Sequence, residues 1–469
     1  MKLFIPRNFQ SELAIPHMLD VPRCALHAGC GMGKTVTTLA ALDILMLAGE
    51  VNRPLVLAPL RVARNGWGQE AGKWEQFHHL KVATITGNET DRLAALRSRA
   101  DIYTCNYENL PWLYEQYKDK WPFDCIVSDE STKLKGFRGS EQVSKLGKEF
   151  VRGGGGSRTT ALARVAHKKV KRFIELTGTP SPNGIKDLWG QMWFLDGGRR
   201  LGRIHSAFEQ RYFRPTRDGY GIEPLPHSFD LVCDAIKDLC LSLDAADYFD
   251  LPGTIINEIY VDLPDKAMRL YREMEREMFI EIDRTGVEAV NAAAKSMKCM
   301  QLANGAVYLD DKGTFALTHD AKLDALESIV EESCGKPLMV AYNFKSDLAR
   351  LQQRFKQGRA LVTQRDEDDF KAGKIPVLFC HPDSAGHGID DFQKVCNEIA
   401  FFGSGWNLET RMQLIERIGE TRQAQVGNTL PVVIHNILAR KTVDEVIKLR
   451  VESKRAVQDL LIEYMKRGV

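Results

Sequence analysis

AGCGMGKT, at residues 28–35, is the stretch of this chain that decides its fold. It follows the apolar run CALHA and precedes the helix-like run VTTLAALDILMLAG (36–49). A glycine-rich turn between a strand and a helix points backbone N–H groups at a phosphate, at the positive end of the helix dipole. The stretch therefore predicts a P-loop, in which the backbone wraps the phosphates of ATP at Gly29, Gly31 and Gly33.

The last two residues of this stretch carry the chemical groups that a nucleotide site needs. Lys34 would reach the β- and γ-phosphates, and the Thr35 hydroxyl would hold Mg²⁺. The first glycine of the strict pattern is replaced by Ala28. The alternative is a chance glycine-rich turn, which the strand before it and the helix after it make a poor explanation.

A pair of acids follows another apolar run, in CIVSDEST (125–132). Asp129 stands at the end of this expected strand, where it can bind Mg²⁺ through water, and Glu130 can polarise the attacking water as a general base. An Asp-Glu pair on its own usually belongs to a solvated loop. Ligands of open α/β sheets bind at the carboxyl ends of the strands, so after a P-loop this pair is the expected partner.

Short apolar runs alternate with helix-length segments in two separate parts of the chain. This rhythm indicates parallel sheets covered by helices on both faces, and hence an α/β fold with two doubly wound lobes. The expected domains are a first lobe at 1–198, a helical insert and linker at 199–318, and a second lobe at 319–469. The runs that predict strands are CALHA (24–28), PLVLAP (54–59), KVATIT (81–86), DIYTCNY (101–107), DCIVSDE (124–130), RFIELTG (172–178), PLMVAY (337–342), RALVT (359–363), PVLFCH (376–381), NEIAFFG (397–403) and PVVIHNIL (431–438).

Two segments predict long helices. Residues 264–302 have a helical pattern interrupted at Gly286, and a charged helix at 442–467 closes the chain. The run GGGG at 153–156 lies between two elements of the first lobe, and we expect it to be a mobile loop.

The composition is that of a globular protein. Of the 469 residues, 44% are hydrophobic and 27% are charged, and no apolar run is long enough to span a bilayer or to form the core of a signal peptide. Because the formal net charge is only +2, a nucleic-acid partner would have to be held by a local basic surface. The ten cysteines form no C-x-x-C pair, which favours reduced thiols over a zinc site or disulfides.

The order of these and further motifs resembles the core of superfamily-two helicases, specifically the Swi/Snf-type branch, over nearly the whole chain. The most discriminating match is Leu-Thr-Gly-Thr-Pro after the sixth expected strand, where RNA-directed DEAD-type enzymes usually carry Ser-Ala-Thr. The resemblance implies two RecA-like lobes that use ATP and Mg²⁺ and act on DNA. The matching segments are RNFQSELAIPHML (7–19), APLRVARNGWGQEAGKW (58–74), YTCNYENL (103–110), DESTKLKG (129–136), LTGTPSPNG (176–184), SAGHGID (384–390) and QLIERIGETRQAQ (413–425).

Roles for several side chains follow from this resemblance. Gln10 lies in the segment that reads adenine in the family, and an amide can pair with both edges of that base. The segments at 58–74 and 103–110 are similar to motifs that contact the sugar–phosphate backbone. The implied DNA contacts are Arg61, Arg64, Tyr107, Lys133 and Lys135. The alternative for the basic residues is a solvated surface side chain, and for the tyrosine a place in the core.

The sixth motif departs from the family pattern. That pattern has two arginines, which stabilise the charge that develops on the transferred phosphoryl group. Gln413 and Arg417 fit it, but Glu420 stands where the second arginine is expected. Either Arg422 replaces that arginine through a change of turn at the nearby glycine, which we favour, or Arg417 acts alone. The alternative for Arg417 is a surface salt bridge.

The function that the resemblance implies is an ATP-driven DNA motor, a DNA-dependent ATPase that translocates on duplex DNA. The chain looks most like the compact stand-alone members carried by bacteriophages and bacteria. We therefore expect a monomer in the cytoplasm, that of a bacterial host if a phage encodes it, with protein partners unknown. Single-stranded DNA remains open as a substrate. Two alternatives also stay open: a strand-separating helicase, and a nucleotide-dependent DNA-binding switch without turnover, which the altered sixth motif favours.

Overall fold

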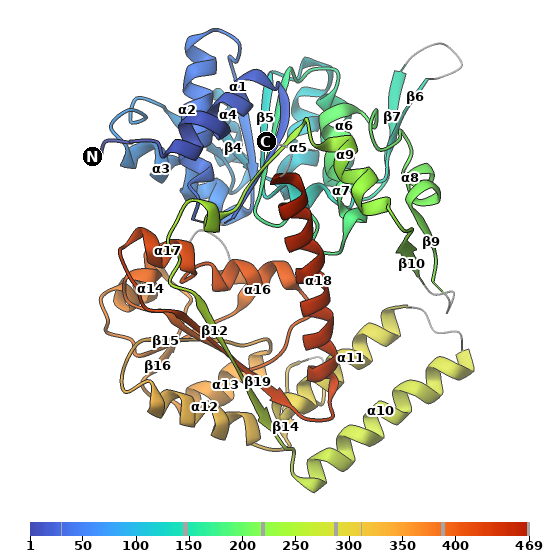
Figure 1. Cartoon of the computed structure of the whole chain (residues 1–469), viewed down its shortest axis with the longest axis vertical. Helices are drawn as coiled ribbons and strands as arrows, with labels where there is room; N and C mark the ends of the chain where they lie inside the picture. Colours follow the sequence, from blue (N-terminus) through green and yellow to red (C-terminus); the bar gives the residue numbers. More distant parts are fainter. Residues whose placement is uncertain are drawn as a thin grey trace. The chain divides into compact units, whose positions relative to one another are not determined.

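Figure 1 shows the computed structural model of the chain. It describes residues 1–29, 31–143, 149–216, 221–285, 289–310, 312–385 and 390–466. Contacts between residues divide the chain into two units. The first contains Met1–Tyr248 and Ala456–Val469, and the second contains Phe249–Arg455. Each unit is built on one large parallel sheet.

The sheet of the first unit has seven strands, and neighbouring strands are parallel. Six of them coincide with apolar runs that predict strands, and β11 is the exception. Their order is β11 (Cys240–Leu243), β1 (Arg23–Ala28), β8 (Arg172–Thr177), β5 (Cys125–Asp129), β2 (Pro54–Ala58), β4 (Ile102–Asn106) and β3 (Val82–Ile85).

The sheet of the second unit has six strands, which are also parallel to their neighbours. Five of them coincide with expected strands, and the edge strand β12 does not. Their order is β12 (Thr254–Val261), β19 (Val432–Ala439), β18 (Glu398–Phe401), β15 (Leu338–Ala341), β17 (Val377–Cys380) and β16 (Gly358–Ala360). Three antiparallel pairs complete the strands: β6 (Ser140–Val143) with β7 (Glu149–Arg152), β9 (Phe213–Pro215) with β10 (Ile222–Pro224), and β13 (Ala306–Tyr308) with β14 (Phe315–Leu317).

Helices cover both faces of the second sheet, as the alternation of side chains along β15 shows. Leu338 and Val340 pack in one apolar cluster with residues of α12 (Ala321–Glu332) and α13 (Lys345–Arg354). Met339 and Ala341 pack in another, with residues of α14 (Gln364–Lys371) and α16 (Leu408–Ile415). A strand buried on both faces is typical of a doubly wound sheet. The expected α/β fold with two RecA-like lobes is confirmed.

The remaining helices connect the strands. In the first unit they are α1 (Ile15–Asp20), α2 (Lys34–Leu47), α3 (Trp67–Lys73), α4 (Glu89–Arg97), α5 (Leu110–Tyr117), α6 (Ser157–Ala166), α7 (Leu188–Asp196), α8 (His205–Tyr212) and α9 (Ser228–Ile236). In the second they are α10 (Asp265–Thr285), α11 (Ala289–Asn304), α15 (Pro382–Ala385) and α17 (Glu420–Gln425). The closing helix α18 (Val443–Lys466) has residues in both units.

The long helices agree with the pattern of the sequence. The segment expected to be helical at 264–302 forms α10 and α11, drawn in yellow in Figure 1, and Gly286 between them lies outside the described residues. The expected closing helix at 442–467 is α18. The segment 199–318 is divided between the units, because residues 199–248 belong to the first and 249–318 to the second.

The glycine run at 153–156 packs closely against a neighbouring turn. The Arg138 N–H donates to the Gly154 carbonyl at 3.0 Å. A Cβ atom on Gly155, whose φ is +96°, would lie 2.1 Å from the Gly136 carbonyl oxygen. The run therefore lets two backbone segments approach each other, and the expected mobility of this loop stays a prediction.

The nine cysteines in the described part of the chain are free thiols, of which eight are buried and Cys334 is exposed. Among the described residues, no helix is both long enough and apolar enough to cross a membrane.

Candidate active site

The glycine-rich loop leaves the carboxyl end of β1 and enters α2, as the sequence predicts. Gly31 and Gly33 have φ angles of +81° and +76°, which side chains with a Cβ rarely adopt. The Lys34 ammonium donates to the carbonyl of Ala28 at 2.7 Å and to that of Gly29 at 3.1 Å. The loop thus curls around its own lysine, and Thr35 follows, half-buried, in the first turn of α2.

Three neighbouring strands bring the expected motifs to one edge of the first sheet. β8 lies between β1 and β5, and all three run parallel. The loop follows β1, Thr177 ends β8, and Asp129 ends β5. Because the carboxyl ends of parallel strands meet at one edge, residues far apart in the sequence converge where ligands of such sheets bind.

The Asp129 carboxylate is buried and held by an aromatic side chain. The Trp67 indole N–H donates to Asp129 Oδ2 at 3.0 Å, and Trp67 is itself fully buried as the first residue of α3. Burial raises the pKa of Asp129, while the indole hydrogen bond and the nearby Lys34 charge act in the opposite direction. This contact could not be predicted from a local sequence pattern, because the two residues are 62 positions apart.

Glu130 occupies a backbone conformation that is unusual for its residue type. Its φ of 64° and ψ of 62° lie in the left-handed region, where a non-glycine residue signals local strain. The Tyr107 hydroxyl donates to the Asp129 carbonyl at 2.9 Å and lies 2.8 Å from the Ser128 hydroxyl. Tyr107 is only 2% exposed. It supports the turn of the acid pair, and its burial favours the place in the core that was the alternative, while its contact with DNA stays a prediction.

Gln10 lies against the P-loop. Its amide Nε2 donates to Thr37 Oγ1 at 2.8 Å, and its Oε1 accepts from the Arg7 N–H at 2.9 Å. A Cβ atom on Gly33 would lie 2.8 Å from Gln10 Nε2, so the loop glycine makes room for this side chain. In the structure the amide braces the loop, and its reading of adenine stays a prediction.

Helix α7 supports the acid pair from the far side, which the sequence did not lead us to expect. The Ser131 hydroxyl donates to Gln191 Oε1 at 2.8 Å, and Gln191 Nε2 donates to the Pro180 carbonyl at 2.7 Å. A Cβ atom on Gly190 would lie 2.6 Å from the Leu134 carbonyl oxygen. A glycine inside the apolar run LWGQMWFLD is the one local signal of this close approach.

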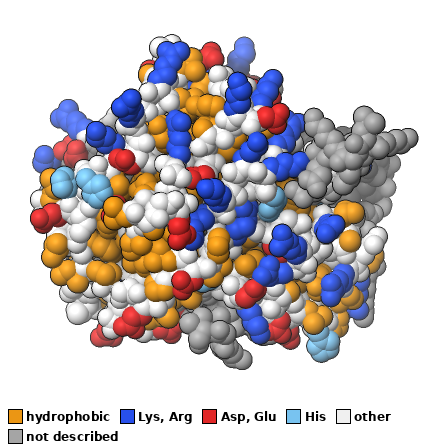
Figure 2. All heavy atoms as spheres, turned by 90° about the horizontal axis from the view of Figure 1, so that it is seen from above, with side chains coloured by type: hydrophobic (Ala, Val, Ile, Leu, Met, Phe, Trp, Pro, Cys, Tyr) orange, Lys and Arg blue, Asp and Glu red, His pale blue; other side chains and the backbone are white. Residues whose placement is uncertain are grey.

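The expected basic DNA contacts lie on two short turns of the first unit. Arg64 is exposed on the π-helical turn η2 (Val62–Gly66), and Arg61, just before this turn, is half-buried, which lowers its pKa. Lys133 is exposed and Lys135 half-buried after the acid pair. Figure 2 shows Lys and Arg side chains spread over much of one face of the molecule, with fewer Asp and Glu among them. The distribution of charge on this face therefore does not by itself identify one DNA-binding surface.

The second unit carries the expected residues of the sixth motif on α16 and just after it. Gln413 is 3% exposed, and its amide has no hydrogen-bond partner among the residues described. Arg417 is also buried, and its Nε donates to the Gln413 carbonyl at 3.2 Å. A buried amide without a partner is rare in folded proteins and is often satisfied by a ligand or by water. Residues 386–389 of the fifth motif lie outside the described residues.

Glu420 and Arg422 make separate contacts. The Thr254 hydroxyl at the start of β12 donates to the Glu420 carboxylate, whereas the Arg422 guanidinium forms an ion pair with Asp390. Asp390 belongs to the fifth motif. The glutamate at the place of the second arginine is thus bound to an edge strand, and Arg422 contacts a residue of the fifth motif.

The donor groups fit the expected cofactors. No group of three or more His, Cys, Asp and Glu residues that could hold a metal occurs in the described ranges. Mg²⁺ is usually held by one or two protein oxygens together with phosphate oxygens and water, rather than by a cage of side chains. The Thr35 hydroxyl and the Asp129 carboxylate are oxygen donors of that kind, at the same sheet edge as the P-loop.

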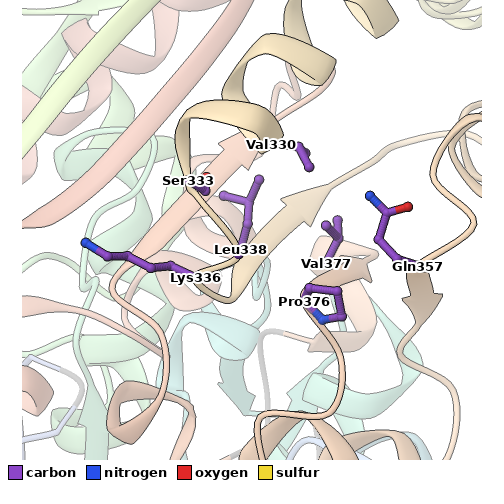
Figure 3. A pocket seen from close by; sticks show the side chains of 8 residues that line it. Val330, Ser333, Lys336, Leu338, Gln357, Pro376 and Val377 are labelled. Carbon is purple, nitrogen blue, oxygen red and sulfur yellow. The ribbon is translucent and has the colours of Figure 1, made fainter.

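A cavity of about 220 Å³ in the second unit is a poor candidate for the active site. It is lined by Leu338 and Val377, the first residues of β15 and β17, and by Gln357 and Pro376 just before two strands. These positions are the amino ends of the strands, opposite to the edge where parallel sheets bind ligands. Figure 3 shows mainly apolar side chains there, with Lys336 extending away from the others.

Comparison with known proteins identifies relatives over the whole chain. Residues 20–307 match the SNF2-related domain family. Protein p41 of Acyrthosiphon pisum secondary endosymbiont phage 1 is 49% identical over 474 residues, covering 100% of both chains. The ATP-dependent helicase MG018 of Mycoplasma genitalium is 21% identical and matches 92% of this chain. The ATP-dependent helicase/translocase YwqA of Bacillus subtilis is 22% identical and also matches 92%.

The relatives differ in length. The chain spans the full length of the phage protein but only 40% of MG018 and 46% of YwqA. Among solved structures, the Sulfolobus solfataricus SWI2/SNF2 ATPase core in complex with dsDNA aligns with 99% of this chain and 96% of its own, at 21% identity and a TM-score of 0.43.

Proposed function

Because the chain belongs to the SNF2-related domain family and carries an ATP-dependent helicase core, we propose that it hydrolyses ATP to ADP and phosphate when DNA stimulates it, and moves along duplex DNA. ATP use and the enzyme class follow from the family. The DNA stimulation, the duplex substrate and the movement are the proposal.

One observation carries the proposal. The P-loop with Lys34, the threonine at the end of β8, and the acid pair Asp129–Glu130 lie at the carboxyl ends of three adjacent parallel strands. A phosphate cradle, a metal-binding carboxylate and a general base are the parts that phosphoryl transfer to water requires. A chance glycine-rich turn would not place all three at one sheet edge.

Within the proposal each side chain of the first unit has a defined task. The Lys34 ammonium, which now donates to carbonyls of its own loop, would turn to the phosphates of ATP. Thr35 and Asp129 would hold Mg²⁺, which when bound neutralises charge on the phosphates. Glu130 would accept the proton of the attacking water. Gln10 would hold the adenine ring of ATP and keep its contact with the P-loop.

The second unit would supply the remaining groups. The buried amide of Gln413 has no partner among the described residues, which supports a ligand contact there. Arg417 and Arg422 would stabilise the charge that develops on the γ-phosphate. Because these residues belong to a different unit from the P-loop, DNA that favours closure of the two units would accelerate hydrolysis, and hydrolysis would reset the grip on DNA.

Contacts with DNA would come from Arg61, Arg64, Lys133 and Lys135. Two of these side chains, Arg64 and Lys133, are exposed in the structure. Contacts of basic residues with phosphates release counterions, so affinity falls steeply with salt. Replacing either exposed residue by alanine should weaken binding to all DNA sequences alike and lower the salt slope by about one.

Steady-state ATP hydrolysis tests the proposal. Rates would be measured without nucleic acid, with duplex DNA, with single-stranded DNA and with RNA, beside the Glu130→Gln variant. Strong stimulation by duplex DNA, lowered about 100-fold or more in the variant, would support it. Equal stimulation by single strands would indicate a strand-separating helicase. The absence of turnover under every condition would overturn hydrolysis and favour a nucleotide-dependent binding switch.

A further inference from the structure

We propose that Trp67 is a positioning residue, which holds the metal-binding carboxylate of Asp129 and transmits to it the contact of DNA with the turn that carries Arg64. The inference rests on the proposed function, because it assigns to Asp129 the binding of Mg²⁺ and to Arg64 the binding of DNA.

Trp67 and Asp129 are in direct contact. The indole N–H of Trp67 donates to Asp129 Oδ2 at 3.0 Å, and both side chains are buried. A hydrogen bond to one carboxylate oxygen fixes the plane of the group and leaves the other oxygen to face a metal. Groups that orient a metal ligand in this way matter nearly as much as the ligand itself. The orientation of Asp129 thus depends on where Trp67 lies, together with the backbone N–H of Glu130, which also donates to this carboxylate.

Trp67 lies close in sequence to a candidate DNA contact. It is the first residue of α3 and directly follows the π-helical turn η2, on which Arg64 is exposed. A candidate DNA contact, Arg64, and the indole that holds Asp129 are only three positions apart. Displacement of this turn by a bound phosphate backbone would therefore displace the indole.

The turn that carries Arg64 has an uncommon backbone conformation. π-Helical turns are rare, lie within helices as local bulges, and occur frequently at functional sites. The turn is anchored to the sheet by the Thr104 hydroxyl, which donates to the Ala63 carbonyl at 2.6 Å. Gly66 and Gly68 flank Trp67, so its neighbours carry no side chains that would fix its backbone. The segment is therefore tied to the sheet at Ala63 and reaches Asp129 through the indole of Trp67, between two glycines.

The neighbouring tryptophan provides a matched control. The Trp74 indole N–H donates to Glu70 Oε1 at 2.8 Å, so it also binds a carboxylate, but one outside the acid pair. Trp67→Phe and Trp74→Phe each remove one indole–carboxylate hydrogen bond from the same segment. Only the first of these bonds involves Asp129.

The experiment measures ADP binding by calorimetry over a range of Mg²⁺ concentrations, first without DNA. We expect Trp67→Phe to raise the half-saturating Mg²⁺ concentration by about 10- to 100-fold, while ADP affinity in EDTA stays unchanged. Trp74→Phe should match the wild type in both. Partial unfolding of the variant would weaken ADP binding in EDTA as well, so an unchanged ADP affinity there distinguishes loss of Mg²⁺ binding from loss of folded protein. A wild-type Mg²⁺ requirement in Trp67→Phe would overturn the inference.

A second set of measurements tests the link to DNA. Its deciding variant is Arg64→Ala, which replaces an exposed side chain. Saturating duplex DNA should lower the half-saturating Mg²⁺ concentration of the wild type and of Trp74→Phe. This shift should be absent in Arg64→Ala and in Trp67→Phe. If Arg64→Ala kept the full shift, the transmission from DNA would be refuted. Failure of the proposed function looks different, because the wild type itself would then show no Mg²⁺-dependent nucleotide binding.

Discussion

Ser131 donates a hydrogen bond of 2.8 Å to Gln191, and so ties the turn after the acid pair to helix α7. The other end of the same amide donates to the Pro180 carbonyl at 2.7 Å, just beyond β8. One buried side chain thereby joins the segments that follow two neighbouring strands of the candidate site. A buried amide with both ends satisfied makes the relative position of these segments specific.

The close approach of α7 predicts a large effect of Gly190→Ala. The added Cβ would lie 2.6 Å from the Leu134 carbonyl oxygen, which is backbone and cannot rotate away. We expect the free energy of unfolding to fall by about 1–3 kcal/mol, and ATP hydrolysis to fall with it, because the acid turn must shift. Urea denaturation and steady-state turnover measure the two effects.

Gly72→Ala is the control for this substitution. Gly72 also lies inside a helix, α3, but nothing would lie within 4 Å of its added Cβ. Alanine should therefore stabilise this position by roughly 0.5–1 kcal/mol through helix propensity. Equal effects of the two substitutions would show that the approach of α7 is not tight.

Glu175 predicts an unusual pH dependence of stability. It is 0% exposed on β8, and neither carboxyl oxygen has a hydrogen-bond partner in the described residues. Burial raises the pKa of Glu175 well above its ordinary value, although the Arg23 charge opposes this. The unfolded chain releases the proton as pH rises above the ordinary range, while the folded chain keeps it. Stability is therefore present at low pH and is lost as pH rises.

Glu175→Gln removes this titration. The difference in unfolding free energy between variant and wild type should shift in favour of the variant with rising pH, by up to about 1.4 kcal/mol per unit. Urea denaturation from pH 5 to pH 8 measures the slope. The exposed Glu12→Gln serves as a control and should leave the slope unchanged. Parallel stability curves for wild type and Glu175→Gln would contradict the prediction.

A buried ion pair in the second unit predicts a large loss of stability when one of its two partners is replaced. Lys322 Nζ lies 2.6 Å from Asp444 Oδ2, at 0% and 1% side-chain exposure, and also donates to Asn304 Oδ1 at 2.9 Å. Lys322→Met would leave the Asp444 charge buried without its cation, at a cost of about 3–5 kcal/mol. Arg354→Met removes a more exposed ion pair and should cost about 1 kcal/mol or less. Similar midpoints for both variants in urea would refute the difference.

The sixth motif predicts which arginine acts in hydrolysis. Arg422 forms an ion pair with Asp390, whereas Glu420, at the place of the expected arginine, is bound by Thr254. Arg422→Ala should lower kcat by about 1,000-fold with little change in KM, because the charge is needed mainly in the transition state. The exposed Arg440→Ala should have no effect. An unchanged kcat in Arg422→Ala would leave Arg417 as the sole arginine.

Much of the fold could be predicted because buried parallel strands leave continuous apolar runs in the sequence. Two strands escaped this signal. Thr254–Glu258, the first five residues of β12, are all exposed and include Asn257 and Glu258, so the edge strand shows no apolar run. β11 has only four residues. It follows α9 after only three residues, so CLSL does not stand out from the apolar helical segment before it.

The candidate site could also be predicted only in part. The P-loop and the acid pair are local in sequence, so their residue types and flanks predict them. The contacts that orient them are not local. Trp67 and Asp129 are 62 positions apart, and Ser131 and Gln191 are 60 apart. The resemblance implies that Tyr107 contacts DNA. In the structure its ring is buried and its hydroxyl donates to the Asp129 carbonyl, a contact that the sequence pattern does not indicate.

The distribution of thiols has a practical consequence for single-molecule work. Because eight of the nine described cysteines are buried and Cys334 is exposed, a maleimide dye would attach within the described residues at one point of the second unit. That point follows α12, near the amino ends of the strands and away from the edge where parallel sheets bind their ligands. The wild-type chain thus provides its own attachment site for a fluorophore, with which the proposed movement on DNA can be tested on tethered molecules.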